Sequence, residues 1–287
     1  MNRLGDYANR IVGPCELLED FSWRHRRSAV LRLRDAGGNE WFLKCHRDRE
    51  RFAAELKAYR TWVPALRGRA PRLRAFDEPL QAMIMSALPG QPVSWPALQP
   101  GASGTERARE RAIHRAAGAV LRRLHDGQPA VPWPRFAADK MEHFNDLRPA
   151  VAALLTRRQL DVARAEVARL TGIPAPVQVP CHHDYTPRNW LVHGDAVYVF
   201  DFEWSGPDAW VADLARLHLG IWPTRPDLRE AFLQGYGRHL GPADGVALHG
   251  CAILTGVWLV SKAHETGQPS FEDACRSALL RLIDRAH

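Results

Sequence analysis

Residues 182–203 read His182-His183-Asp184-Tyr185-Thr186-Pro187-Arg188-Asn189-Trp190-Leu191-Val192-His193-Gly194-Asp195-Ala196-Val197-Tyr198-Val199-Phe200-Asp201-Phe202-Glu203. The pattern H-x-D occurs twice in this stretch, ending at Asp184 and at Asp195. Gly194-Asp195 separates two apolar, β-prone runs, which predicts a β-hairpin with these two residues in its turn. One H-x-D pattern therefore lies before the open end of the hairpin, and the other lies in its turn.

The predicted hairpin brings two oxygen-bearing side chains together. Residues whose numbers sum to about 389 face each other, so Asn189 lies opposite Phe200 and beside Asp201. An amide oxygen next to a carboxylate forms a hard, all-oxygen site of the kind that binds Mg²⁺ together with phosphate oxygens. Asp184, five residues before Asn189, then orients a hydroxyl group and accepts its proton. This set of residues predicts ATP-dependent phosphoryl transfer.

The second H-x-D pattern, His193-Gly194-Asp195, lacks this context. Phe200, which cannot bind a metal, follows Asp195 at the offset where Asn189 follows Asp184. The alternative interpretation of Asp184 and Asn189 is that they are ordinary loop residues, because Asp and Asn both favour turns. The hairpin that returns Asp201 to Asn189 favours the catalytic interpretation.

The segment His182-x-Asp184-x-x-x-x-Asn189, followed by Asp201-Phe202-Glu203, resembles the catalytic and metal-binding segments of the aminoglycoside phosphotransferase and choline kinase-like family. Members of that family have a bilobal protein-kinase-like fold. The resemblance implies that Asp184 is the catalytic base, that Asn189 and Asp201 are the Mg²⁺ ligands, and that His182 is structural. The nucleotide it implies is ATP or GTP.

Other positions match the family less evenly. Gly206-Pro207 and Asp213-Leu214-Ala215 fit its pattern, and we expect Asp213 to be a structural hydrogen-bonding residue. The family usually has glycine where this chain has His183. Glu203 either helps to hold the metal or is solvated. Residues 21–28, where a phosphate-covering loop is expected, contain no glycine. Arg24, Arg26 and Arg27 in this segment either neutralise phosphate charge or are solvated.

A lysine and a glutamate upstream complete the set that a kinase needs for nucleotide phosphates. Lys44 ends the second strand of a predicted hairpin over residues 29–43. Glu55 lies within the apolar stripe of the helix predicted over residues 50–63, where a carboxylate is costly unless it is paired. We expect Lys44 and Glu55 to form that pair; the alternative is that both reach solvent. The strand at residues 83–85 leads to a hinge whose backbone contacts adenine, at Met85 and Ala87.

The coarse architecture is α+β, with a small β-rich lobe and a larger, mostly helical lobe. We place the nucleotide-binding lobe at residues 1–90 and the catalytic and acceptor-binding lobe at residues 91–287. A chain of 287 residues buries roughly 75% of its unfolded surface and needs no cross-link. Five widely spaced cysteines predict free thiols in a reducing, cytoplasmic compartment: Cys15, Cys45, Cys181, Cys251 and Cys275.

Charge and hydropathy narrow the class of partner. The net charge of +7 comes from arginines scattered through predicted helices, which favours a solvated surface over nucleic-acid binding. The apolar run at residues 246–260 is too short to cross a bilayer, so we expect a buried helix and no membrane association. We expect a monomer or a homodimer.

The acceptor expected from the sequence is a small molecule with a hydroxyl group. A polycationic acceptor would call for a strongly acidic site, which the chain's composition does not indicate. A neutral or modestly charged acceptor, such as a nucleoside or sugar-containing antibiotic, is therefore favoured. The alternatives are a choline-, homoserine- or sugar-kinase-like enzyme, or a non-catalytic pseudokinase-like binding protein. Four tryptophans either form a stacking wall for an acceptor ring or belong to the core: Trp204, Trp210, Trp222 and Trp258.

Overall fold

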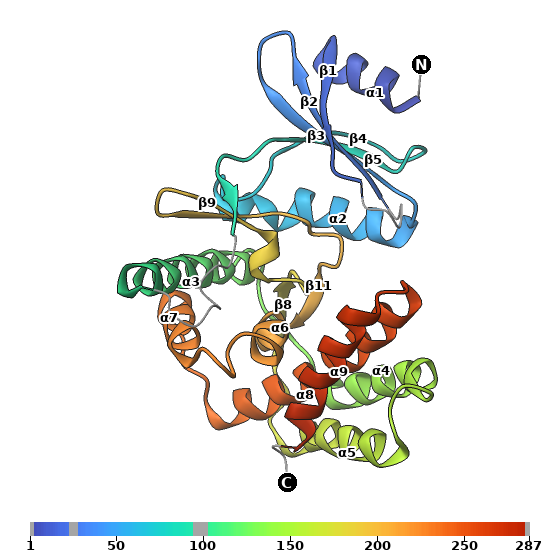
Figure 1. Cartoon of the computed structure of the whole chain (residues 1–287), viewed down its shortest axis with the longest axis vertical. Coiled ribbons are helices and arrows are strands. Elements are labelled where there is room, and N and C mark those ends of the chain that lie inside the picture. The colour runs from blue at the N-terminus through green and yellow to red at the C-terminus, as the bar shows by residue number, and fades with distance from the viewer. Residues whose placement is uncertain (1–2, 23–27, 94–102, 285–287) are drawn as a thin grey trace. The chain divides into compact units, whose positions relative to one another are not determined.

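A computed structural model describes residues 3–22, 28–93 and 103–284. The chain divides into two compact units, which are shown together in Figure 1. The first comprises Met1–Ala102 and Pro187–Gly206, and the second comprises Ser103–Thr186 and Pro207–His287. The first is built on an antiparallel sheet and the second is mostly helical, which confirms the expected α+β class. Of the segment 21–28 expected to cover phosphates, residues 23–27, which include Arg24, Arg26 and Arg27, lie outside the described residues.

The units differ from the division expected after residue 90, since the first extends to Ala102 and also contains Pro187–Gly206. Backbone pairing explains the addition, because the short strand β6 (Gln91–Pro92) pairs with β9 (Trp190–His193). The residues that follow this hairpin also bond to side chains of the first unit, as described below.

A five-stranded antiparallel sheet forms the centre of the first unit. Its order is β1-β2-β3-β5-β4, so β3 and β5 are interior strands. The hairpin expected over residues 29–43 is confirmed as β2 and β3. The strands are β1 (Cys15–Asp20), β2 (Ser28–Asp35), β3 (Glu40–His46), β4 (Leu73–Asp77) and β5 (Ala82–Ser86).

Helices α1 (Arg3–Val12) and α2 (Arg49–Thr61) belong to the same unit, and alternation along β3 decides what they meet. Successive side chains of a strand point to opposite faces. Leu43 packs in a cluster with Tyr7 of α1. Lys44, one residue later, points to the other face, where it contacts α2. The sheet therefore buries an apolar cluster on one face and a charged one on the other.

The hairpin that follows residues 182–188 forms in the predicted register. Strand β9 pairs with β10 (Ala196–Val199), and Val192 lies opposite Val197. Beyond the paired residues, Phe200 N–H donates to the Asn189 carbonyl at 3.2 Å. The predicted position of Asn189 opposite Phe200 is confirmed.

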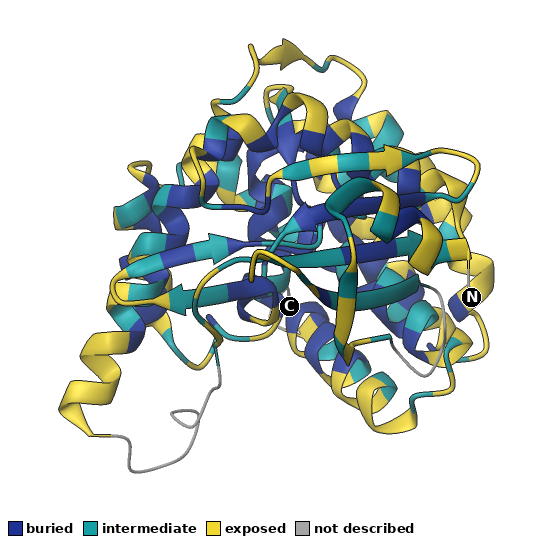
Figure 2. Cartoon of the chain, turned by 90° about the horizontal axis from the view of Figure 1, so that it is seen from above, coloured by how far each residue is buried: buried dark blue, intermediate teal, exposed yellow. Residues whose placement is uncertain are grey.

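The second unit consists of helices around a small three-stranded sheet of order β11-β8-β7. Figure 2 shows that many helices of the chain carry both buried and exposed residues. The strands are β7 (Val131–Pro132), β8 (Val177–Cys181) and β11 (Gly206–Ala209). The main helices are α3 (Gly104–His125), α4 (Phe136–Val151), α5 (Arg157–Ala168), α6 (Ala215–Leu219), α7 (Pro226–Tyr236), α8 (Pro242–Glu265) and α9 (Pro269–Asp284).

Short 3₁₀ turns connect elements in both units: η1 (Val63–Leu66) and η4 (Pro187–Asn189) in the first, and η3 (Arg169–Gly172) and η5 (Trp210–Leu214) in the second.

Helix α8 is long and apolar enough to cross a membrane by length and composition, but 61% of its most apolar window is buried inside the protein. It contacts α4, α5, α6 and α9. The buried helix expected over residues 246–260 is therefore confirmed, and it forms the core of the second unit.

Helices α3 and α7 approach each other through glycines. A Cβ atom added at Gly118 would overlap the Phe232 carbonyl oxygen, and one added at Gly235 would overlap the Arg115 carbonyl oxygen. These clashes involve backbone atoms, which cannot move aside like the end of a flexible side chain. The two glycines therefore set how closely the helices pack.

We predict that Gly118→Ala destabilises the protein although alanine favours helices. Overpacking costs about 1–3 kcal/mol or more, which outweighs the roughly 1 kcal/mol gained in helix propensity. Gly245→Ala is the matched control, because Gly245 in α8 has open space where a Cβ would lie, and it should leave stability equal or higher. Urea unfolding of both variants measures the difference, and equal midpoints would contradict the packing argument.

Candidate active site

The ammonium group of Lys44 is the centre of a buried ionic cluster in the first unit. Lys44 Nζ lies 2.8 Å from Glu55 Oε2, 2.6 Å from Asp201 Oδ1 and 3.1 Å from Glu203 Oε2. The side chains of Lys44 and Glu55 are 8% and 1% exposed. The expected Lys44–Glu55 ion pair is confirmed, and the alternative that both reach solvent is wrong.

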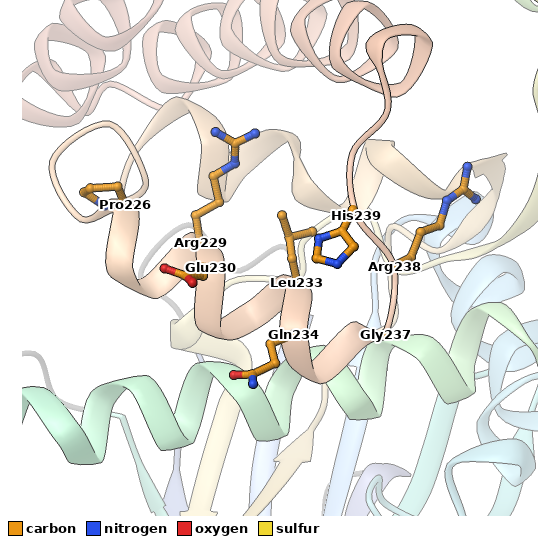
Figure 3. Close-up of a pocket in the computed structure, with 8 residues that line it drawn as sticks. All are labelled: Pro226, Arg229, Glu230, Leu233, Gln234, Gly237, Arg238 and His239. Atoms are coloured by element: carbon orange, nitrogen blue, oxygen red, sulfur yellow. The ribbon is translucent and has the colours of Figure 1, made fainter.

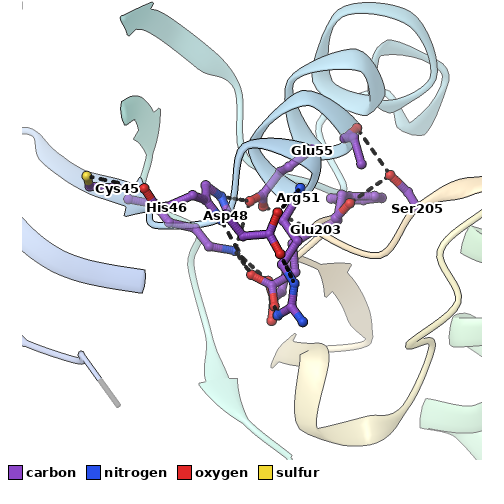
Figure 4. A network of polar contacts seen from close by, with 11 residues as sticks. Cys45, His46, Asp48, Arg51, Glu55, Glu203 and Ser205 are labelled. Atoms are coloured by element: carbon purple, nitrogen blue, oxygen red, sulfur yellow. Dashed lines mark hydrogen bonds and ion pairs between the residues drawn. The ribbon is translucent and has the colours of Figure 1, made fainter. Parts of the chain in front are cut away.

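Glu203 is held on two sides. Its Oε2 contacts Lys44, and its Oε1 accepts from Arg51 Nη1 at 3.2 Å. Only 15% of the side chain is exposed, so the solvated alternative is wrong. Figure 4 shows Glu203 close to Arg51 and Glu55, which both belong to α2.

His46 is a member of this cluster that sequence reasoning missed. Its Nε2 lies 2.7 Å from Glu55 Oε2 and its Nδ1 lies 3.8 Å from Glu203 Oε2, as part of the network in Figure 4. A signal was present, because His46 follows Lys44 by two residues and therefore shares its face of β3.

Hydrogen bonds and close polar contacts attach the segment after the hairpin to α2. Phe202 N–H donates to Glu55 Oε1 at 3.2 Å. The Ser205 hydroxyl donates to the Phe202 carbonyl at 2.7 Å and lies 3.4 Å from the Ala54 carbonyl oxygen. Glu55 thus bonds Lys44 and His46 through one oxygen and the Phe202 amide through the other. One carboxylate therefore links β3, α2 and the residues that follow β10.

The charges in the cluster fix one another's ionisation. Burial alone would lower the pKa of Lys44, but the charges of Asp201, Glu55 and Glu203 raise it well above its ordinary value. Burial alone would raise the pKa of Glu55, but the charge of Lys44 and the hydrogen bond from His46 lower it. Lys44 is therefore protonated and Glu55 ionised at neutral pH.

The residues present fit a divalent cation of the Mg²⁺ type. Asn189 is 4% exposed and supplies an amide oxygen, and Asp201 supplies a carboxylate at the same end of the hairpin. Asp201 has a φ of 68°, a left-handed conformation that Asp tolerates better than most residues. Oxygen donors of these two kinds are those that Mg²⁺ prefers.

The loop that carries Asp184 belongs to the second unit and follows β8. Asp213, 1% exposed, accepts hydrogen bonds from the main-chain N–H of His182 at 2.8 Å and of His183 at 2.5 Å. His125 also bonds Asp213, at 3.0 Å. The expected hydrogen-bonding role of Asp213 is confirmed.

Several charges control the ionisation of Asp213. Burial alone would raise its pKa, but the hydrogen bond and charge of His125 lower it. Asp184 N–H donates to His182 Nδ1 at 3.3 Å. The loop is thus held by its own main chain and by one buried carboxylate.

His183 adopts a left-handed conformation, with a φ of 61°. Glycine reaches this region without strain, which gives a physical reason for the family's usual glycine at this position. The His183 Nε2 atom lies 3.2 Å from Asp208 Oδ2, which also accepts from Lys140 Nζ at 2.6 Å. Burial lowers the pKa of His183, but the hydrogen bond and charge of Asp208 outweigh this and raise it.

Asp184 itself is almost fully buried, at 1% exposure. One of its oxygens accepts a hydrogen bond from Arg216 Nη1. Arg216 was also missed by sequence reasoning, although it stands three residues after Asp213 and shares one face of the same helical turn.

The two hinge residues expected to contact adenine lie on and just beyond an interior strand. Met85 is in β5, paired with Phe42 of β3 and Leu73 of β4. Ala87 N–H donates to the Glu40 carbonyl at 3.0 Å. The Ala87 amide proton is therefore already used within the sheet.

Two of the four tryptophans belong to the core of the second unit. Trp210 stacks on Tyr236, with ring centroids 4.8 Å apart, and both Trp210 and Trp222 are buried in the second unit. Trp204 belongs to the first unit, where the Arg51 guanidinium lies 3.8 Å from its ring centroid. The core alternative is correct for Trp210 and Trp222.

A hollow of about 620 Å³ lies along α7 and the turn that follows it. Figure 3 shows it lined by polar and charged side chains, among them Arg229, Glu230 and Gln234. The residues lining this hollow include no member of the predicted site.

We predict that Glu55→Gln lowers the free energy of unfolding by about 3–5 kcal/mol, because it leaves a buried ion network incomplete. The pKa of Glu55 is lowered in the folded state, so its contribution is present above the unfolded carboxyl pKa of about 4.3 and is lost as the pH falls through the folded value. Urea unfolding at neutral pH and below pH ~4 checks both expectations. Glu50→Gln, an exposed change on the same helix, should cost about 0.5 kcal/mol or less.

One comparison with known proteins identifies a family. The profile of the phosphotransferase enzyme family matches residues 21–247. No curated protein sequence matches the chain.

Solved structures share the fold at low sequence identity. A choline/ethanolamine kinase family protein from Mesorhizobium loti is 18% identical, with a TM-score of 0.68 over 97% of this chain and 93% of its own. The macrolide 2′-phosphotransferase MphH from Brachybacterium faecium is 21% identical, with a TM-score of 0.65 over 96% of each chain. A thermostable mutant of the aminoglycoside phosphotransferase APH(4)-Ia, in ternary complex with AMP-PNP and hygromycin B, is 14% identical, with a TM-score of 0.69 over 99% of this chain and 98% of its own.

The family profile covers most of the chain, from the residue after β1 into α8. The chain therefore belongs to the phosphotransferase enzyme family and is a small-molecule phosphotransferase of the protein-kinase-like fold.

Proposed function

We propose that this enzyme transfers the γ-phosphoryl group of ATP, or of GTP, to a hydroxyl group of a neutral or modestly charged small molecule. The observation that carries the proposal is the buried cluster around Lys44, which joins a lysine to Glu55 and Asp201. This is the ion network that kinase-like folds use to hold nucleotide phosphates and metal. The complex of the APH(4)-Ia mutant with AMP-PNP supports a nucleotide substrate.

The charge balance of the cluster suits a metal and polyphosphate. Three carboxylates, Glu55, Asp201 and Glu203, surround Lys44, with Arg51 as the second cation that is always charged. The carboxylates outnumber these cations by one. A divalent ion held by Asn189 and Asp201 would reverse that balance and favour triphosphate, and it would supply charge neutralisation for the transferred group.

Lys44 is the proposed ligand of the α- and β-phosphates, and Glu55 orients it. His46 in turn restrains Glu55. For adenine, the Ala87 amide is engaged with Glu40, so we assign the contact of Ala87 to its carbonyl oxygen. The N–H of Leu88, next in the chain, is the proposed donor, and Met85 lies behind it in the strand.

Asp184 is the proposed base. The acceptor hydroxyl oxygen forms a bond to the γ-phosphorus while the bond from that phosphorus to the β,γ-bridging oxygen breaks. The hydroxyl proton passes to the Asp184 carboxylate, and ADP leaves with the electron pair of the broken bond. Bond breaking runs ahead of bond making in most such reactions, so Asp184 mainly positions the hydroxyl.

The charge beside Asp184 narrows the acceptor class. Arg216 contacts the carboxylate, and a guanidinium stays charged at any working pH. A cationic group next to the reacting hydroxyl would meet a like charge. This supports a neutral acceptor, such as a nucleoside or sugar-containing antibiotic, over choline or a polycationic aminoglycoside. An antibiotic acceptor would make the enzyme a resistance factor, acting in the cytoplasm where ATP is present.

We predict that Asp184→Asn lowers kcat by about 10²- to 10⁴-fold while the KM for ATP changes by about threefold or less. ADP release with Mg²⁺, ATP and a panel of hydroxyl compounds measures both constants. Asp195→Asn is the matched control, because Asp195 is an exposed turn residue in the second H-x-D pattern. Equal losses in the two variants, or full activity of Asp184→Asn, would contradict the proposed base.

Pairs of acceptors that differ only in charge test the acceptor class. Choline and 3,3-dimethyl-1-butanol form one pair, and glucosamine and glucose form another. We expect the neutral member of a reacting pair to have the higher kcat/KM, by roughly tenfold or about 1.4 kcal/mol. A consistent preference for the cationic members would refute the proposed class.

A further inference from the structure

One helical turn holds three consecutive residues of the catalytic loop. Helix α6 begins directly after η5, so Asp213 and Arg216 are three residues apart on a continuous helical path. Such residues lie on the same face. Asp213 accepts the N–H groups of His182 and His183, and Arg216 donates to the Asp184 side chain.

The contact between Arg216 and Asp184 is buried. The two side chains are 12% and 2% exposed. In such a setting water screens the pair poorly, and a charge-assisted hydrogen bond is strong and directional. Replacing one partner would remove an opposite charge that contacts the other at a buried site.

The contact acts on a different part of the loop from Asp213. Asp213 fixes main-chain atoms of residues 182 and 183, which places the Cα of Asp184 but leaves its side-chain torsions undetermined. A carboxylate on two rotatable bonds has several rotamers. The guanidinium of Arg216, a planar group with donors in fixed directions, selects among them.

We propose that Arg216 is a positioning residue, which holds the Asp184 carboxylate in the orientation that receives the acceptor hydroxyl. This inference rests on the proposed function of Asp184 as base. A buried ion pair is weak evidence for a role in stability, because apolar residues often replace such pairs without loss. Orienting the Asp184 carboxylate would explain why a charged residue, Arg216, occupies this buried position.

A double-mutant cycle tests the proposal with Asp184→Asn, Arg216→Gln and the double variant. The readout is kcat and KM for Mg²⁺-dependent ATP hydrolysis, with water as acceptor, and with any acceptor identified above. We expect Arg216→Gln to lower kcat about 10- to 100-fold with the KM for ATP changed by about twofold or less. In the Asp184→Asn background the same change should alter kcat by about twofold or less, because the group it positions is gone.

Two further variants separate positioning from folding. Arg216→Lys retains the charge without the planar fork and should recover part of the lost kcat. Arg229→Gln removes an exposed arginine of α7 that lines the hollow in Figure 3 and should leave kcat unchanged. Melting temperatures of all variants provide a second cycle that does not depend on turnover, and the loss from Arg216→Gln should be smaller when Asp184 is already Asn.

The outcomes are distinguishable. Equal factors for Arg216→Gln in both backgrounds would show that Arg216 acts independently of Asp184 and would overturn the inference. A lower melting temperature with unchanged kcat would leave a purely structural role and would also overturn it. Full activity of Asp184→Asn would refute the proposed function of Asp184, and the inference would fall with it.

Discussion

A single buried ammonium group determines how the first unit is assembled. Lys44 is surrounded by carboxylates from α2 and from the residues after β10, segments more than a hundred residues apart in the chain. A buried lysine without partners would lose its proton, or its side chain would move out to solvent. Residues 187–206 therefore belong to this compact unit: Asp201 and Glu203 surround Lys44, and strands β9 and β10 form a separate small sheet with β6.

In the second unit, a buried negative charge likewise holds several segments together. The Asp213 carboxylate is buried and accepts hydrogen bonds from His125 and from the main-chain N–H of His182 and His183. A helix end, a loop and a 3₁₀ turn meet at this one group. Each unit thus contains a buried ionised residue, Lys44 or Asp213, whose partners come from distant segments of the chain. Burying either residue without partners would be costly.

The sequence predicted those parts of the site that local rules determine. The register of β9 and β10 followed from a two-residue turn between alternating strands, and the structure has the predicted pairs. The Lys44–Glu55 pair followed from a carboxylate in an apolar stripe. The roles of His46 and Arg216 were not predicted, because they depend on which elements pack against β3 and α6. The use of the Ala87 amide within the sheet escaped notice because main-chain bonding leaves no trace in side-chain identity.

His183 has a left-handed backbone conformation in the loop that precedes Asp184. The shape of this loop does not depend on the side chain at position 183. The loop's main chain is held through the N–H groups of residues 182 and 183, which every residue except proline can supply. The side chain at 183 bonds to Asp208, separately from those main-chain bonds. Changing the side chain at 183 therefore keeps the main-chain donors that hold the loop, and glycine would also relieve the strain of the left-handed backbone. Proline is excluded, because it lacks the N–H and its ring fixes φ at a negative value.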